Sequence, residues 1–299
     1  MIFTVGTIDL EVADRLRILA ERCFGLSANR VTPGKDGGAY VDIQFQSLDL
    51  VRWMQRAGFV KPSSPEAFIP SPVLTGSAET ARAFLRGLFE GDGHLHSSSS
   101  YPCLSTTSPR LAEEAQQLLL SLGIAAHRNL FKAAKGALSA RPMHVLTIVD
   151  EDSVLTFTKD IGFIGDRKQE RLVNGPRPVV NTFDIVPNQG AVLRSLYRYV
   201  GRGTGPGRSK RGANRRLYRA LMHYISERQP RQLPRKQLLE LMGKFPDLAA
   251  NSHLREIANP AFVYSKVAAI RKAHARTADL EVPAAASFVA NGVLVHNKR

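Results

Sequence analysis

Residues 85–93 (Leu-Arg-Gly-Leu-Phe-Glu-Gly-Asp-Gly) place a single carboxylate, Asp92, between two glycines. Apolar residues recur before it at helical spacing, so we expect it to end an amphipathic helix. Gly87 has no Cβ and would let another backbone approach closely, whereas Gly91 and Gly93 would allow a sharp turn into a strand. Carboxylate oxygens are ligands for hard cations. An ordinary Gly-Asp-Gly turn after a helix is the alternative interpretation.

With its surroundings, this segment resembles the second LAGLIDADG motif of a DOD-type homing endonuclease. The flanking segments that match the family are Phe68-Ile69-Pro70, Leu122-Gly123-Ile124 and residues 161–168. In that family two such helices pack side by side, and each delivers one acid to the scissile phosphates. The resemblance implies that Asp92, with Gly91, binds Mg²⁺ or Mn²⁺ for DNA phosphodiester hydrolysis. Glu90 is expected to cap or pair near the helix end.

Two departures from the family pattern bear on activity. The family carries a lysine two residues before the Ile-Pro, where this chain has Ala67, and Lys61 is the nearest substitute. The first LAGLIDADG helix, with its partner acid, has no match in the chain. One acid cannot form the usual two-strand cleavage centre, so we expect double-strand cleavage to be weak or lost.

His94 and His96 follow the motif on an expected strand. Residues two apart on a strand share a face, so the two imidazoles could bind a metal together. Side chains that lie along a DNA groove are the favoured interpretation.

Two stretches of the chain look like copies of one another. Each reads as a short strand, an amphipathic helix, a glycine stop, further strand-like runs and a closing helix. The first copy has its strand at residues 2–7, its glycine stop at Gly25, a further strand at 39–45 and its closing helix at 48–57. The second has the corresponding features at 103–107, Gly123, 128–131, 144–149 and 153–161, and an extra helix, 79–91, precedes it. The first copy is therefore expected to lack the counterpart of that helix and of the strand after it.

A basic segment follows residue 174. Residues 194–236 contain 13 Lys or Arg and one acid, Glu227. Helical patterns are expected at 192–199, 213–226, 235–243 and 248–257, and residues 201–212 read as a Gly/Ser/Arg-rich linker. The candidate DNA-binding residues are Arg208, Lys210, Arg211, Arg215, Arg216 and Arg219. Phosphate contacts from such a face give affinity with little sequence information. A solvated basic linker is the alternative.

The C-terminal residues 277–283 and 287–297 are similar to the paired C-terminal blocks of inteins. Asn291-Gly292 is typical of a two-residue hairpin turn. The resemblance implies that the Asn297 amide attacks its own backbone carbonyl and breaks the peptide bond. It also implies that His296 acts as a general acid and that Asp279 is the block acid.

The intein pattern is also incomplete. Lys298 stands where the family has Cys, Ser or Thr, Ala286 replaces the usual histidine, and no N-terminal nucleophile block is found. Complete splicing in cis is therefore excluded on chemical grounds. At most, Asn297 cyclisation would release Lys298-Arg299, and only together with an N-terminal intein fragment.

Composition limits the partners. The chain has 299 residues, 43% of them hydrophobic, and a formal net charge of +15, which favours double-stranded DNA as a partner. No apolar run approaches the roughly 18 residues of a membrane span. Cys23 and Cys103 form neither a disulfide framework nor a zinc motif, so we expect a cytoplasmic location.

The expected fold is α+β, a LAGLIDADG homing endonuclease fold with αββαββα repeats and a truncated first repeat. The expected parts are a truncated first half (1–75), a complete second half (76–173), a basic helical segment (174–260), the C-terminal strands of an intein (Hint) splicing domain (261–297) and an extein-like tail (298–299). The leading function is a homing endonuclease within an intein. The alternative is a catalytically decayed remnant that only binds DNA.

Overall fold

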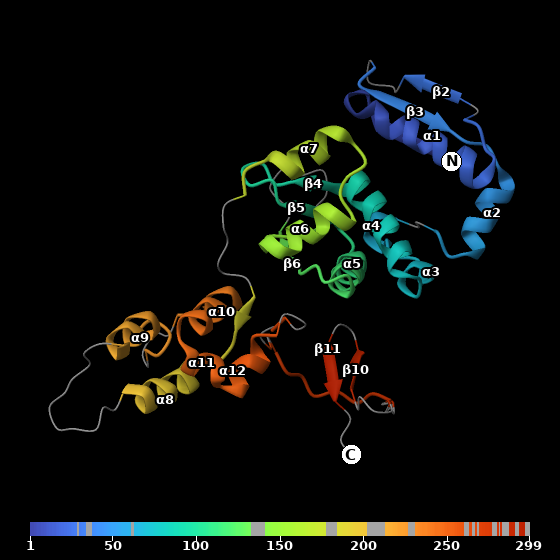
Figure 1. Cartoon of the computed structure of the whole chain (residues 1–299). Coiled ribbons are helices and arrows are strands. Elements are labelled where there is room, and N and C mark those ends of the chain that lie inside the picture. The colour runs from blue at the N-terminus through green and yellow to red at the C-terminus, as the bar shows by residue number, and fades with distance from the viewer. Residues whose placement is uncertain are drawn as a thin grey trace, which may run out of the picture. The chain divides into compact units, whose positions relative to one another are not determined.

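The computed structural model describes residues 1–28, 30–33, 38–60, 63–132, 141–177, 184–201, 213–226, 231–259, 263–264, 267, 269–276, 280, 282, 287–290 and 293–296. The chain divides into two compact units, Met1–Pro178 with Ala278–Arg299, and Val179–Thr277. The first unit contains two similar halves, each with helices against an antiparallel sheet (Figure 1). The α+β class expected from the sequence is confirmed.

The first half begins with β1 and ends with α2. Its elements are β1 (Ile2–Gly6), a 3-10 turn (Thr7–Asp9), α1 (Leu10–Phe24), β2 (Arg30–Pro33), β3 (Tyr40–Gln44) and α2 (Leu48–Arg56). The three strands form an antiparallel sheet in the order β1-β3-β2. Helix α1 ends as expected at Gly25, whose left-handed conformation (φ 62°) lets its N–H donate to the carbonyls of Ala20 and Glu21.

The second half repeats this order after an additional helix and strand. Its elements are α4 (Ala78–Asp92), β4 (Gly93–Leu95), β5 (Pro102–Thr106), α5 (Pro109–Ser121), β6 (His127–Phe131), β7 (Met143–Thr147), α6 (Glu151–Asp160) and α7 (Asp166–Asn174). A 3-10 turn (Ser64–Glu66) and the short α3 (Ser71–Leu74) lead into it. The antiparallel sheet has the order β4-β5-β7-β6.

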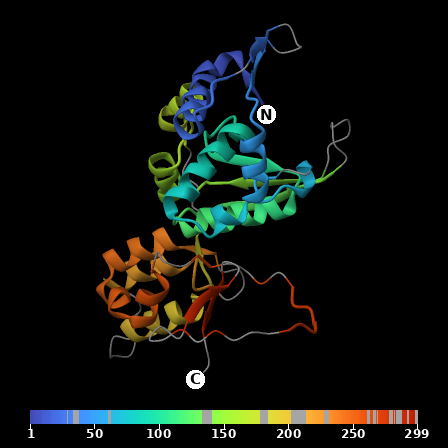
Figure 2. The same cartoon turned by 90° about the vertical axis from the view of Figure 1, so that its right-hand side faces the viewer.

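One apolar core holds the second half together. Leu104 of β5 faces Leu146 of β7 in the strand register, and both side chains are fully buried. Helices α4 and α5 contact this sheet, and Figures 1 and 2 show them packed against it. Phe89 of α4 meets Phe157 of α6 edge-on, with ring centroids 4.9 Å apart. The position of α4 is therefore set by packing along its whole buried face.

The second unit is mainly helical. It contains β8 (Ile185–Val186), α8 (Gly190–Gly201), α9 (Ala213–Leu221), β9 (Leu233–Pro234), α10 (Arg235–Lys244), α11 (Pro246–Ala250) and α12 (Ser252–Ile257). The single helical pattern expected at 248–257 is two helices. The break occurs because Asn251 is extended and its side chain accepts a hydrogen bond from the N–H of Leu254, capping α12.

A buried arginine joins distant parts of the second unit. Arg235 is 4% exposed and forms a two-point ion pair with Asp184, at 2.5 and 2.9 Å. Its guanidinium also donates to the carbonyl of Ile257 at 2.8 Å. Arg235 therefore links Asp184, just before strand β8, to helices α10 and α12. Removal of either partner would leave a buried charge without its counter-ion, which is costly.

The C-terminal residues form a hairpin as expected. Strand β10 (Ser287–Ala290) pairs antiparallel with β11 (Val293–His296), and Ala290 faces Val293 in the register. Asn291 and Gly292 lie outside the described residues. Every helix among the described residues is too short or too polar to cross a lipid bilayer.

The two cysteines provide a test of this packing. Cys103 on β5 is 2% exposed, and burial raises the pKa of its thiol, whereas Cys23 on α1 is exposed. Only the thiolate reacts with iodoacetamide. We therefore expect Cys23 to be alkylated at least 10-fold faster than Cys103 in the native protein, as read by peptide mass spectrometry. The denatured protein, in which both thiols are accessible, is the control. Equal rates in the native state would contradict the sheet packing.

Candidate metal and DNA site at the end of helix α4

The local sequence explains where helix α4 starts and stops. The Ser77 hydroxyl caps its first turn by accepting a hydrogen bond from the N–H of Thr80. Ala81, Leu85 and Phe89 form its buried stripe. At the other end, a Cβ on Gly93 would lie 2.4 Å from the carbonyl oxygen of Phe89. Glycine is therefore required there because the chain turns sharply from α4 into β4, as the sequence indicated.

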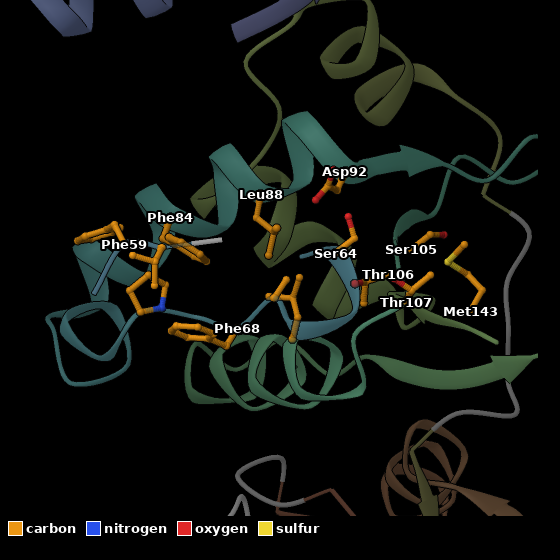
Figure 3. Close-up of a pocket in the computed structure, with 14 residues that line it drawn as sticks. Phe59, Ser64, Phe68, Phe84, Leu88, Asp92, Ser105, Thr106, Thr107 and Met143 are labelled. Atoms are coloured by element: carbon orange, nitrogen blue, oxygen red, sulfur yellow. The ribbon is translucent and has the colours of Figure 1, made fainter. Parts of the chain in front are cut away.

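Asp92 is the last residue of α4 and is exposed. With Phe84 and Leu88 on the same side of the helix, it lines a cavity of about 420 Å³. Figure 3 shows these three side chains pointing from α4 towards the side chains of Ser64 and Phe68. Within the described part of the chain, no hydrogen bond or ion pair engages the Asp92 carboxylate, so its oxygens are available to a ligand.

The acid two residues earlier has a different role. Glu90 is almost buried, and its carboxylate accepts hydrogen bonds from the N–H groups of Ile164 (2.7 Å) and Gly165 (3.0 Å), just before helix α7. A carboxylate at a helix N-terminus satisfies free amides and interacts favourably with the helix dipole. The expectation that Glu90 caps or pairs near the helix end is confirmed.

Lys168 completes this arrangement, although no role was expected for it from the sequence. Its ammonium lies 3.3 Å from the Glu90 carboxylate and donates to the carbonyls of Glu90 (2.5 Å) and Gly93 (3.2 Å). The cation is thus bound to the backbone on both sides of Asp92 in sequence. Lys168 lies within residues 161–168, which match the family pattern, and this position was the available sequence signal for a role near Asp92.

The first half is joined to the same helix terminus. Glu11 of α1 accepts a hydrogen bond from the N–H of Asp166 at 3.0 Å. Asp9 forms a two-point ion pair with Arg167, at 2.9 and 2.8 Å. The hydrogen bonds from Arg167 hold the pKa of Asp9 below its ordinary value. Both halves therefore place carboxylates at the N-terminus of α7.

His94 and His96 lie beside this site without a cluster of metal ligands. Among the described residues, no group of three or more His, Cys, Asp or Glu side chains could hold a metal ion. Burial lowers the pKa of His94, as do the neighbouring His96 and Lys168. His96 Nδ1 is 2.8 Å from the Ser99 hydroxyl.

The remaining predicted site residues are only partly described. Arg216 and Arg219 are exposed on α9, opposite its buried Leu217 and Leu221. The side chains of Arg215 and His296 are not described, although their backbones belong to α9 and β11. The predicted residues that lie outside the described part of the chain are Arg208, Lys210, Arg211, Asp279 and Asn297.

We predict that Glu90→Gln destabilises the protein by about 2 kcal/mol, because the charge that pairs with the half-buried Lys168 is removed. Glu79→Gln on the exposed first turn of the same helix is the control and should cost less than about 1 kcal/mol. Urea unfolding followed by circular dichroism measures both. Equal effects of the two substitutions would show that Glu90 does not hold the end of helix α4 to the start of helix α7.

Residues 79–162 match the family model described as a LAGLIDADG-like domain. A replicative DNA helicase DnaB of Rhodothermus marinus is 28% identical over 260 residues, which is 82% of this chain and 26% of the helicase. A glutamine–fructose-6-phosphate aminotransferase of Methanocaldococcus jannaschii is 28% identical over 169 residues, 54% of this chain and 14% of that protein. The chain thus spans only a minor part of the curated relatives it matches.

Two kinds of solved structure are also similar. The homing endonuclease I-DmoI, in complex with DNA and Ca, has a TM-score of 0.39 at 14% identity and covers 54% of this chain and 73% of that chain. Other I-DmoI structures contain target DNA with Mg or Mn. WhiA from Thermatoga maritima has a TM-score of 0.37 at 14% identity and covers 87% and 84%. On the family match, residues 79–162 form a LAGLIDADG-like domain.

Proposed function

We propose that this chain is the endonuclease-bearing part of an intein and that it hydrolyses a DNA phosphodiester with Mg²⁺ or Mn²⁺. The observation that carries the proposal is Asp92, an exposed carboxylate without a protein partner among the described residues, at the end of the motif helix of a LAGLIDADG-like domain. Other acids near this site are engaged, since Glu90, Glu11 and Asp9 all bind α7 or its N-terminal approach.

The donor set at the end of α4 fits a magnesium ion. Asp92 would supply a carboxylate oxygen, and the Gly91 carbonyl belongs to the last helical turn, whose carbonyls lack helical partners. Mg²⁺ prefers oxygen ligands, few of them from the protein, with water and phosphate oxygens completing its shell. When bound, such an ion would activate water and stabilise charge on the leaving oxygen. Lys168 would hold the end of α4, and so Asp92, in position.

The intein context is supported by the range of matching proteins. A helicase and an aminotransferase catalyse unrelated reactions, yet this chain matches a minor part of each. A mobile insertion common to unrelated hosts accounts for that pattern. The β10–β11 hairpin leads directly to Asn297, where cyclisation would break the chain. With Lys298 and Ala286 in place, Asn297 cyclisation in the presence of an N-terminal intein fragment is the most that this chemistry allows.

A non-enzymatic DNA-binding remnant is the second candidate. It is favoured by Ala67, which stands where the family has a lysine and which lines the cavity beside Asp92. The two functions differ in one property, because cleavage requires Asp92 whereas binding through basic residues does not.

We predict that Asp92→Asn lowers Mg²⁺-dependent nicking at least 1000-fold, because a metal ion contributes several kcal/mol to the transition state. The substrate is a supercoiled plasmid that carries the joined sequences flanking the coding segment, and the readout is conversion to open circles. DNA affinity of the variant should stay within about 2-fold of the wild type. A wild-type protein that binds this DNA but does not nick it would instead identify the decayed remnant.

A second prediction concerns the basic segment. Replacing Arg208, Lys210, Arg211, Arg215, Arg216 and Arg219 together with glutamine should remove most duplex-DNA affinity. The dependence of affinity on salt should also flatten, its slope falling by about 0.9 for each phosphate that is no longer neutralised. Fluorescence anisotropy over a range of salt concentrations measures both. A matched variant with lysine at all six positions keeps the charge and should keep most of the affinity. Unchanged binding by the glutamine variant would rule out this surface.

A further inference from the structure

The cavity beside Asp92 has two unlike ends. Figure 3 shows Phe59, Phe68 and Phe84 at one end, and Asp92 with Ser64 at the other. All three rings are half-buried, so each presents part of its surface to the cavity. The volume, about 420 Å³, lies in the range of roughly 300–1,000 Å³ that is typical of small-molecule sites. The cavity therefore suits a ligand with an apolar body and one polar end.

The wall that carries Phe68 is clamped to helix α5. The Ser108 hydroxyl donates a hydrogen bond to the Ala67 carbonyl at 2.6 Å. The Glu114 carboxylate accepts one from the N–H of Ile69, also at 2.6 Å. Both bonds are shielded from water, at least in part, so this wall keeps its shape without a ligand. A wall that is already formed is what small-molecule sites usually have.

A second wall comes from helix α4 and the segment after α2. Phe84, Leu88 and Asp92 are spaced four residues apart on α4, so the three side chains share one face of the helix. Phe59 stacks on Trp53, with ring centroids 6.1 Å apart and an angle of 16° between the planes. Both walls thus belong to packed parts of the protein.

The charge in the cavity favours a cation. Among the described residues that line it, Asp92 is the one charged side chain. The faces of aromatic rings also attract cations. The Phe68 ring already carries the guanidinium of Arg110, which lies 4.6 Å from its centroid. A phosphate or another anion would meet a carboxylate and ring faces, so the cavity disfavours the DNA backbone as its occupant.

A metal ion alone would leave much of this space unused. A magnesium ion with six waters takes roughly 200 Å³, because each water occupies about 30 Å³. That is less than half of the 420 Å³ of the cavity. The remaining space is lined by Phe59, Phe84 and Leu88, which form no hydrogen bonds with water. Covering these side chains with an apolar group is favourable, because it removes their surface from water.

We propose that this cavity binds a small organic amine, with its ammonium group on Asp92 and its apolar body among the aromatic side chains. The ammonium donates charge-assisted hydrogen bonds to the carboxylate. The body packs on Phe59, Phe68 and Phe84. Because the amine and Mg²⁺ use the same carboxylate, they compete. Binding of the amine rests on the cavity alone, whereas the competition also rests on the proposed function.

The test titrates the full chain with phenethylamine, followed by NMR of the ligand, without DNA or metal. Phenethyl alcohol has the same body without the charge, and ethylamine has the charge without the ring. We expect both to bind at least 10-fold more weakly than phenethylamine. Phenethylamine should also shift the emission of Trp53, the single tryptophan, because Phe59 stacks on it. Absence of phenethylamine binding, or equal binding of the alcohol, would overturn the proposal.

An asparagine variant locates the ammonium. Asp92→Asn keeps the size of an exposed side chain and should weaken phenethylamine at least 10-fold, while phenethyl alcohol binds as before. Asp152→Asn, at an exposed acid on α6 that does not line the cavity, is the matched control and should change neither. Equal effects of the two substitutions would show that the amine is held by the net charge of the surface and not by this cavity.

The same titration with Mg²⁺ distinguishes the amine site from the metal site. We expect millimolar Mg²⁺ to weaken phenethylamine at least 5-fold in the wild type and not in Asp92→Asn. Amine binding that requires Asp92 but does not respond to Mg²⁺ would support the amine site and count against the proposed metal site. Nicking that requires Asp92, in a chain that does not bind the amine, would support the metal site and overturn the amine site.

Discussion

The N-terminus of helix α7 is the joint on which the placement of the candidate site depends. Carboxylates from two directions meet its free amides, with Glu90 bound to the N–H groups of Ile164 and Gly165 and Glu11 bound to that of Asp166. Because free amides at a helix start must find acceptors, these hydrogen bonds are both geometrically specific and costly to break. They tie the last turn of α4 and the start of α1 to a single short helix.

This joint separates two acids that lie two residues apart. Glu90 points to the protein and is neutralised by Lys168, whereas Asp92 points to a cavity and has no protein partner among the described residues. Residues two apart on a helix face different directions, so the sequence Glu-Gly-Asp necessarily gives one inward and one outward carboxylate. The role of each acid follows from its environment rather than from its type.

Local features of the fold could be predicted from the sequence because local interactions specify them. Patterns over a few neighbouring residues predict the glycine stops at Gly25 and Gly123, the hairpin at 287–296 and the helix that ends at Asp92. Helix α7 and the pairing of β8 with β9 were not predicted. Strand β8 has two residues and depends on a buried ion pair between Asp184 and Arg235, 51 positions apart. Such long-range ion pairs leave no periodic signal.

In the candidate site, too, the local features could be predicted from the sequence and the long-range contacts could not. The outward position of Asp92 follows from the helix and its glycines, but the place of Lys168 depends on α7 folding back onto α4, 75 to 78 residues along the chain. The residue types alone do not show the unequal burial of the two halves, since Phe3 and Leu104 are equally apolar, and the extra helix expected before the second copy was the sequence signal for it. The burial of a side chain depends on which other segments pack against it. The internal repeat gives that comparison within one molecule, because the same strand order holds a covered leucine in one half and an exposed phenylalanine in the other. The fold of the first half is therefore specified by its own strands and helices, while the exposure of Phe3 depends on the segments that pack near it.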